Sequence, residues 1–153
     1  MKKLSKKLPG GLFLLLVCSD MGAKQYIEDT FTPGAEKETI IDGLVLRKVY
    51  NKGFLLNTLE DQPKLVKAAS AAAGLGVAAY DVWLCLRPGH RVKKLGMIFL
   101  SAGALSNIYD RLARGKVIDY IGVKCRSKKI SRLTANLADV YAVIGGVLAG
   151  IGL

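Results

Sequence analysis

Four long apolar segments constrain this chain more than any other feature of its sequence. Each is close to the roughly 20 residues that an α-helix needs to cross the hydrocarbon core of a bilayer. They run from Gly10 to Ile27, from Ala68 to Leu86, from Leu95 to Leu112 and from Asn136 to Leu153. A chain of 153 residues has room for one domain of this kind. We therefore predict an all-α membrane bundle of four transmembrane helices, formed as a single integral membrane domain by residues 1–153.

Each apolar segment contains one aspartate, and these are Asp20, Asp81, Asp110 and Asp139. An ionised carboxylate at the bilayer centre costs about 3 kcal/mol, so these side chains should face protein or water. Small residues at four-residue spacing, such as Ser70, Gly74 and Ala78, favour closely packed helices. One interpretation is therefore a non-enzymatic membrane protein, such as a transporter subunit or an assembly factor, whose buried acids hold helices together.

The chain is strongly basic, with 23 Lys and Arg against 12 Asp and Glu. Nucleic-acid-binding proteins rarely combine this charge with long apolar runs, whereas a membrane protein that faces anionic lipid combines both. We expect membrane lipid, and no nucleic acid, among its partners. The positive-inside rule predicts a cytoplasmic N-terminus, because the basic residues before the first segment are Lys2, Lys3, Lys6 and Lys7. The loop of residues 113–135 disagrees, with seven basic residues and one acid, and we hypothesise that it contacts anionic headgroups.

The connection from Glu28 to Lys64 is too long for a plain link between helices. It carries seven acidic and five basic residues, which suits the extracytoplasmic side. Residues 40–50 are rich in β-branched and aromatic side chains, which is typical of a strand or hairpin. We therefore predict a small extracytoplasmic β-containing loop.

Cysteine and histidine are scarce, which excludes several kinds of site. Cys18, Cys85 and Cys125 are far apart and odd in number, so a disulfide scaffold is excluded. His90 alone leaves little material for a His-rich metal site or a Ser-His-Asp triad, and we predict no metal and no cofactor. A lipoprotein signal peptide that ends before Cys18 is disfavoured, because Val17 is not a small residue and three more apolar segments follow.

Four carboxylates fall on one side of the predicted bundle. With the N-terminus inside, the outer ends of the helices carry Asp20, Asp110 and Asp139, and the outer loop carries Asp119. Two close carboxylates cannot both ionise cheaply, so one retains a proton while the other can act as a base. Asp119 and Asp139 make the best such pair, because no basic residue is adjacent to either in the sequence.

The remaining two acids have basic neighbours, which predicts a structural role. Lys24 follows Asp20 by one helical turn, and Arg111 follows Asp110 directly. A peptidase with a serine nucleophile and a lysine base is a lower-ranked alternative, because Lys24 should stay charged beside Asp20. The serines considered for it are Ser101 and Ser106.

Several motifs resemble those of lipoprotein signal peptidases, the signal peptidase II family. Residues 103–120, GALSNIYDRLARGKVIDY, are similar to the family's GNxxDR…GxVxDF signature, and residues 136–139, NLAD, are similar to its NxAD signature. The DxxxK of residues 20–24 and the NxG of residues 51–53 also match. The motifs occur in the family's order over nearly the whole chain, which is far more specific than any one of them.

The resemblance implies an aspartic endopeptidase in a bacterial cell (inner) membrane, with its active site on the extracytoplasmic side. Its substrate would be a diacylglyceryl-modified prolipoprotein, cleaved just before the lipid-modified cysteine. The catalytic dyad carries over to Asp119 and Asp139, with no metal or covalent intermediate. Substrate-binding or supporting roles carry over to Asn107, Asp110, Arg111, Asn136, Asp20, Lys24, Asn51 and Gly53. We expect a monomer.

The chain departs from the family pattern at three places. Asn51-Lys-Gly53 continues with Phe-Leu-Leu where the family has NxGAAF. Ser106 replaces the usual glycine before Asn107, and Ala135 replaces an aromatic residue. These changes concern packing and substrate contacts and leave the paired acids in place.

Overall fold

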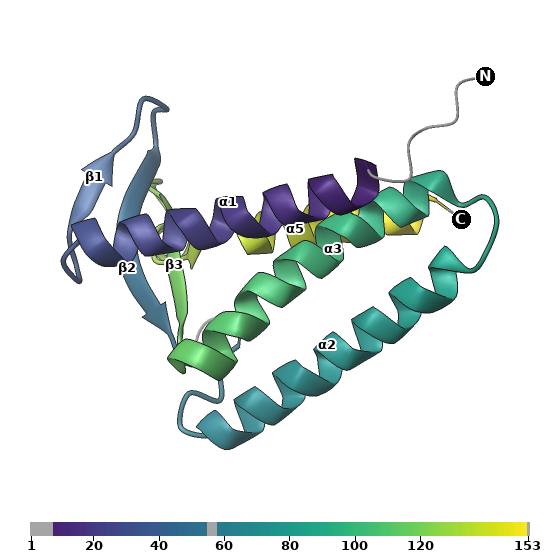
Figure 1. The fold of residues 1–153 in the computed structure, drawn as a ribbon. Helices are drawn as coiled ribbons and strands as arrows, with labels where there is room; N and C mark the ends of the chain where they lie inside the picture. The colour runs from purple at the N-terminus through teal and green to yellow at the C-terminus, as the bar shows by residue number, and fades with distance from the viewer. Residues whose placement is uncertain (1–7, 55–57, 153) are drawn as a thin grey trace.

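The computed structural model describes residues 8–54 and 58–152, which form a helix bundle with a small sheet at one end (Figure 1). Each predicted apolar segment overlaps one long helix, and these are α1 (Leu8–Thr30), α2 (Pro63–Cys85), α3 (Arg91–Tyr109) and α5 (Leu137–Ile151). A π-helical turn, η2 (Asp110–Arg114), continues α3. The helices expected from apolar patterning are therefore present. The N-terminal lysines of the orientation argument, and Leu153, lie outside the described residues.

Composition supports membrane crossing most clearly for α2. Of the described helices, α2 is the one that is both long and apolar enough to cross a membrane. Helix α5 is apolar but has 15 residues, and a helix of that length spans about 22 Å of a hydrocarbon core of about 30 Å. Helix α1 contains Asp20 and Lys24, and α3 begins at Arg91. The predicted bundle of four long helices is present. Length and composition support a membrane crossing for α2, and they do not by themselves support it for α1, α3 and α5.

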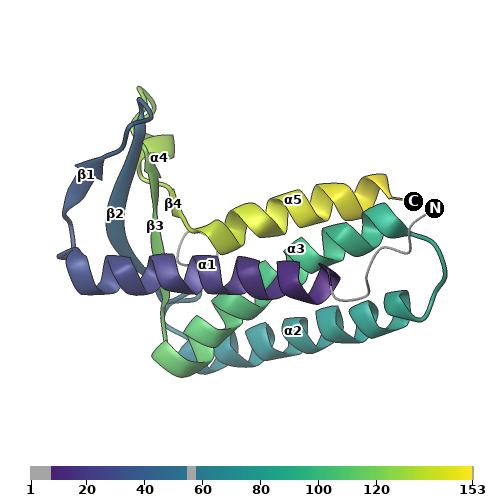
Figure 2. The ribbon, with the colours of Figure 1, turned by 45° about the horizontal axis from the view of Figure 1, so that its top comes forward.

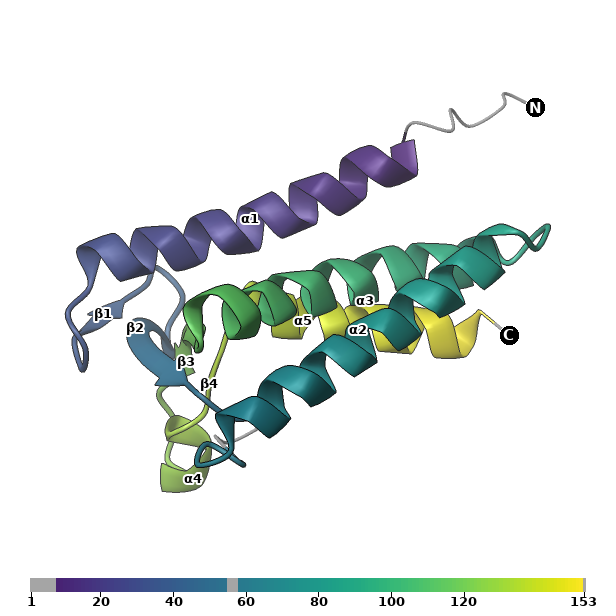
Figure 3. The ribbon, with the colours of Figure 1, turned by 60° about the horizontal axis from the view of Figure 1, so that its bottom comes forward.

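Helix α3 lies at the centre of the bundle and packs against α1, α2 and α5 (Figures 1 and 3). Its contact with α5 is close because glycine lies at the crossing. A Cβ atom at Gly103 would overlap the backbone carbonyl oxygen of Ala138. Since Asn107 lies one turn after Gly103, this approach brings the end of α3 to the first turn of α5.

The sheet has four antiparallel strands in the order β1 (Glu36–Glu38), β2 (Leu44–Asn51), β3 (Val117–Val123) and β4 (Thr134–Ala135). Strand β2 confirms the strand expected near residues 40–50. Strands β3 and β4, with the short helix α4 (Lys128–Ser131) between them, lie in the loop that we analysed by its charge. Residues 117–123 are rich in β-branched side chains and include one aromatic residue, a composition typical of a strand that the argument from charge did not use. The β structure is thus larger than predicted.

One face of the sheet packs on α1. Ile118 and Tyr120 of β3 form a buried cluster with Ile27 of α1. Because side chains alternate along a strand, Val117, Asp119 and the following odd-numbered residues point to the opposite face. The sheet lies at the end of the bundle away from the turn between α2 and α3 (Figure 2). This arrangement leaves a second sheet face toward the ends of α3 and α5.

Candidate active site

A cavity of about 800 Å³ lies between the free face of the sheet and the ends of α3 and α5. Apolar side chains from β2, β3 and α5 form much of its wall, among them Val49, Ile121 and Val143. Its polar lining includes Asn51, Asn107, Arg111, Asp119 and Asp139. An apolar cavity with a few convergent polar groups is the usual form of a binding or catalytic site.

Asp119 enters the cavity wall from the middle of β3. Asp119 is 5% exposed, and it lies opposite Val49 of β2 in the sheet. Oδ1 of Asp119 accepts a hydrogen bond of 2.7 Å from the side-chain amide of Asn136, and Oδ2 accepts one of 3.3 Å from Asn51. The Asn51 amide is itself oriented, because its Oδ1 accepts from the backbone N–H of Gly53 at 3.0 Å.

Asp139 lies in the first turn of α5 and forms a capping box with Asn136. The backbone N–H of Asp139 donates to Oδ1 of Asn136 at 3.0 Å, and Oδ2 of Asp139 accepts from the backbone N–H of Asn136 at 3.1 Å. Oδ1 of Asp139 accepts from Nδ2 of Asn107 at 2.9 Å. Asn136 therefore both caps the helix and bridges the two carboxylates.

Burial and charge act together on Asp119. Burial, followed by the nearby charge of Asp139, raises the pKa of Asp119 from 3.8 to about 6, against hydrogen bonds from Asn51 and Asn136 that lower it. A raised value of this kind is expected for one member of a pair of close carboxylates. Below this pKa, Asp119 holds a proton beside Asp139.

A buried cluster around Lys24 lies behind the cavity wall. Lys24 is fully buried, and its Nζ lies 2.7 Å from Oδ2 of Asp20 and 3.0 Å from Oδ2 of Asp110. Nζ also donates to Oδ1 of Asn107 at 2.8 Å and to Oγ of Ser106 at 3.2 Å. The cluster thus joins α1 to the end of α3 and contacts the cavity wall through Asn107.

Asp20 has a full set of hydrogen-bond donors. Its Oδ1 accepts from the Tyr120 hydroxyl at 3.1 Å and from the backbone N–H of Ala138 at 3.2 Å. Its Oδ2 accepts from Ser106 at 2.5 Å in addition to Lys24. Asp20 therefore fastens α1 to β3, α3 and the start of α5, which is the arrangement of a structural buried carboxylate.

A family model described as signal peptidase (SPase) II matches residues 12–153. The chain belongs to the signal peptidase II family. Curated relatives include a lipoprotein signal peptidase of Sinorhizobium fredii, 33% identical over 92% of this chain and 83% of the relative. Another, from Burkholderia multivorans, is 34% identical over 96% of this chain and 91% of the relative. The resemblance drawn from the motifs is confirmed, and this member of the signal peptidase II family is a protease.

Two solved structures share the fold of this signal peptidase II family member, and each is described as a bacterial membrane enzyme. The first has a TM-score of 0.83 and 22% identity and covers 98% of this chain and 89% of its own. The second has a TM-score of 0.79 and 22% identity and covers 98% and 94%. The bundle with its end sheet is therefore an architecture already seen in experimental structures.

Two charge pairings of this signal peptidase II family member differ from those expected along the sequence. Asp110 pairs with Lys24 of α1 and, at 3.4 Å, with Arg114, whereas Arg111 was the expected partner. The Arg111 guanidinium instead donates to the carbonyl of Gly53 at 3.2 Å and lies over the Phe54 ring, 5.3 Å from its centroid. Helix geometry explains the difference, because consecutive residues point to different sides of a helix.

No basic residue is adjacent to Asp119 or Asp139 in the sequence, but the fold brings one to their cavity. Arg111 lines the same cavity, and its charge acts on both Asp139 and Asp119. Sequence reasoning did not single out Phe54 or Tyr120 as parts of this region. The strand alternation of residues 117–123 could have placed Tyr120 opposite Asp119 and toward α1.

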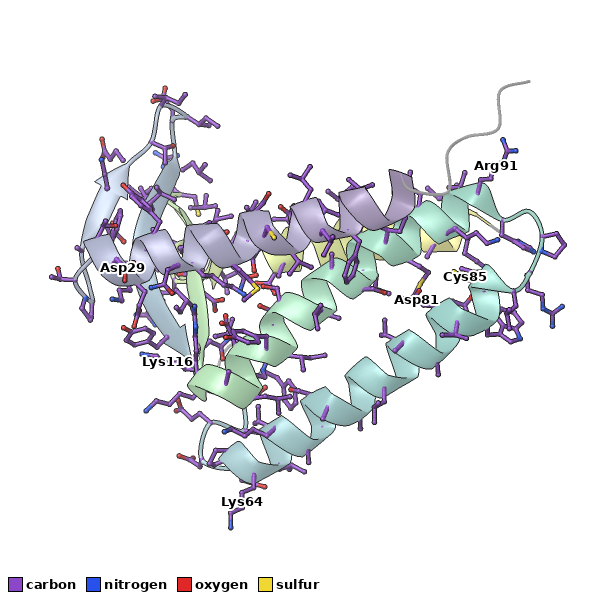
Figure 4. The ribbon with its side chains drawn as sticks, in the orientation of Figure 1. Asp29, Lys64, Asp81, Cys85, Arg91 and Lys116 are labelled. Carbon is purple, nitrogen blue, oxygen red and sulfur yellow. The ribbon has the colours of Figure 1, made fainter. Side chains whose placement is uncertain are left out.

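Asp81 lies apart from the other aspartates of the apolar segments. Figure 4 places it with Cys85 and Arg91 at the end of the bundle away from the sheet. Its carboxylate accepts a hydrogen bond from Ser101, which joins α2 to α3. The other serine considered as a nucleophile, Ser106, is buried against Asp20. Among the described residues, no group of three His, Cys, Asp or Glu side chains is arranged to hold a metal ion.

Proposed function

We propose that this chain is an aspartic endopeptidase that cleaves the signal peptide of bacterial prolipoproteins just before the lipid-modified cysteine. The observation that carries the proposal is the pair of carboxylates, Asp119 and Asp139, bridged by Asn136 on the wall of the cavity. The name of the relatives, lipoprotein signal peptidase, supports the choice of substrate.

The pair can activate water without a covalent intermediate. One carboxylate removes a proton from a water molecule as its oxygen attacks the scissile carbonyl, and the other, protonated, donates to the carbonyl oxygen. The raised pKa of Asp119, about 6, supports this sharing of one proton between the two groups. Apolar side chains form much of the cavity wall, and surroundings less polar than water strengthen these interactions.

The position of the cavity supports a lipid-anchored substrate. A diacylglyceryl group holds the adjacent peptide bond close to the membrane surface, so the carboxylates must lie near the ends of the helices rather than at their middle. Asp119 belongs to β3 and Asp139 to the first turn of α5. Figure 2 shows that α5 begins at the end of the bundle where the sheet lies. We propose a multi-pass protein with a cytoplasmic N-terminus and this site on the extracytoplasmic side.

The alternative, in which buried acids only hold helices together, suits one group of residues better than the other. Asp20 and Asp110 are almost fully buried and pair with Lys24, as helix-joining acids do. Asp119 and Asp139 line a cavity instead. This difference favours catalysis for the second pair.

The test is cleavage of a lipidated precursor by purified Asp119→Asn and Asp139→Asn variants, with Asp81→Asn as the matched control. Asp81 is a half-buried aspartate of α2 that lies away from the sheet. We expect each of the first two variants to lose about 100-fold or more of the cleavage rate while Asp81→Asn keeps the wild-type rate. Wild-type rates in both site variants, with normal folding, would refute the proposed function.

A further inference from the structure

The bonds to the four carboxylate oxygens of the pair are not equivalent. Oδ1 and Oδ2 of Asp139 accept from Asn107 at 2.9 Å and from the backbone N–H of Asn136 at 3.1 Å. Asp119 receives a short bond of 2.7 Å at Oδ1 but a long one of 3.3 Å at Oδ2. Of the four oxygens, Oδ2 of Asp119 is therefore the least tightly held by the donors that the structure describes, and it has the most freedom to carry a proton.

The donor that Asn107 presents to Asp139 is set by Lys24. An amide side chain has one accepting and one donating end, and either end could face a carboxyl group. Oδ1 of Asn107 accepts from Nζ of Lys24 at 2.8 Å and from the amide of Asn136 at 3.2 Å. An ammonium group cannot accept a hydrogen bond, so the carbonyl end must face Lys24 and the NH₂ end must face Asp139.

Helix geometry favours the charge on the same residue. Asp139 is the third residue of α5, where the exposed N–H groups and the helix dipole stabilise a negative charge. Asp119 lies in a strand, which has no comparable dipole. The charged groups that face Asp139 among the described residues are Asp119 on β3, Arg111 on η2 and, through Asn107, Lys24 on α1.

We propose that Lys24 is a positioning residue: by orienting Asn107 it keeps Asp139 ionised as the general base and leaves the shared proton on Asp119, the general acid. This assignment rests on the proposed function. Burial and the charge of Asp139 raise the pKa of Asp119, which agrees with the proton residing there.

With this assignment, each carboxyl group regains its starting protonation state by the end of the reaction. Asp139 takes a proton from water as the water oxygen bonds to the scissile carbon, and Asp119 gives its proton to the carbonyl oxygen. In the second step the C–N bond breaks, and protonated Asp139 gives its proton to the leaving amine. Asp119 recovers a proton from the hydroxyl of the tetrahedral intermediate as the carboxylic acid forms. The pair ends in its starting state.

The first test compares the pH profiles of kcat/KM for the two aspartate variants. We expect Asp139→Asn to be inactive at every pH, because an amide cannot take a proton from water. Asp119→Asn should keep residual activity, about 100-fold below wild type, because an amide can still donate to the carbonyl oxygen. The wild-type rate should fall as the pH rises through the pKa of Asp119, about 6, and the residual rate of Asp119→Asn should not. The reverse asymmetry would overturn the assignment.

The second test changes Lys24 itself and uses Ser106→Ala as the matched control. Lys24→Met removes the shorter of the two hydrogen bonds to Oδ1 of Asn107 and leaves the 3.2 Å bond from Asn136. The amide is then held less firmly toward Asp139, so the midpoint of the fall in kcat/KM on the acid side should move up by about one pH unit. Ser106→Ala removes another neighbour of Lys24 but keeps the Lys24–Asn107 bond, so it should lower stability without moving the midpoint. A Lys24→Met profile with an unmoved midpoint would overturn the positioning role.

The two proposals fail in different ways, and the aspartate comparison does not depend on whether Lys24→Met folds. If Asp119→Asn and Asp139→Asn both cleave at the wild-type rate, the proposed function is wrong. If both lose activity equally and neither keeps a pH-independent residual rate, the function stands and the assignment of acid and base is wrong.

Discussion

The side-chain amide of Asn136 donates a hydrogen bond of 2.7 Å to Oδ1 of Asp119. The carbonyl end of the same amide accepts from the backbone N–H of Asp139 at 3.0 Å. One side chain therefore links strand β3 to the first turn of α5, and it spaces the two carboxylates while it caps the helix. A residue with these two roles can be dissected by substitutions that keep one role and remove the other.

Replacing Asn136 by serine should separate capping from catalysis. Serine is as good an N-cap as asparagine, but its hydroxyl is too short to also reach Asp119. We expect the Asn136→Ser protein to unfold near the wild-type temperature and to lose about 10-fold or more of kcat/KM, the factor for a lost hydrogen bond of about 1.4 kcal/mol. Asn136→Ala should lose both properties, with stability lower by about 1 kcal/mol. Equal activity in the serine variant and the wild type would contradict the bridging role.

Gly103→Ala should disturb the crossing of α3 and α5. Its Cβ atom would overlap the carbonyl oxygen of Ala138, so the helices must move apart at a cost of about 1–3 kcal/mol. Gly146→Ala in α5 is the matched control, because a Cβ there meets nothing within 4 Å. We expect that control to raise stability by about 0.5–1 kcal/mol. Thermal unfolding in detergent checks both, and a neutral Gly103→Ala would show that the crossing is not tight.

The stability of the protein should carry a pH dependence that originates at Asp119. Its folded pKa, about 6, lies above the unfolded value of 3.8, so the folded protein binds this proton more tightly. The contribution to stability is full below the unfolded value and is lost as the pH rises through the folded value, by up to about 3 kcal/mol. The free energy of unfolding, plotted against pH, should therefore have a different slope for the wild type and for Asp119→Asn between about pH 4 and pH 6. Parallel curves would exclude the raised pKa.

Arg111→Lys should weaken the hold on the segment after β2 while keeping the positive charge. The guanidinium donates to the Gly53 carbonyl and lies over the Phe54 ring, and lysine cannot reproduce both contacts with one ammonium group. We expect faster hydrogen exchange at residues 51–54 and a kcat/KM lower by about 10-fold, as for the loss of about 1.4 kcal/mol. Arg114→Lys is the control, because Arg114 pairs with Asp110 outside the cavity lining. An equal effect of the two variants would contradict this role of Arg111.

Much of the fold follows from local patterns in the chain. Long apolar runs predicted the helices. A segment surrounded by lipid must satisfy its own backbone hydrogen bonds, which an α-helix does, and about 20 residues are needed to cross the hydrocarbon core. The motif containing Asn107 and Asp110, with NLAD at residues 136–139, predicted the family and the residues that now line or support the cavity. Strand β3 was missed, because the loop that contains it was analysed by its charge and not by its content of β-branched and aromatic residues.

The amino-acid sequence by itself determined which groups are available: four apolar segments, a family signature and two carboxylates without basic neighbours in the chain. The tertiary structure decided which of them meet. Val49 pairs with Asp119 across β2 and β3, Lys24 of α1 contacts Asp110 at the end of α3, and Arg111 turns to Gly53. These contacts join residues far apart in the sequence, and local patterns do not encode them. They arise because one arrangement pairs the strands, lets the helices approach closely at glycine and gives each buried charge a partner. A buried charge without a partner has a high free energy.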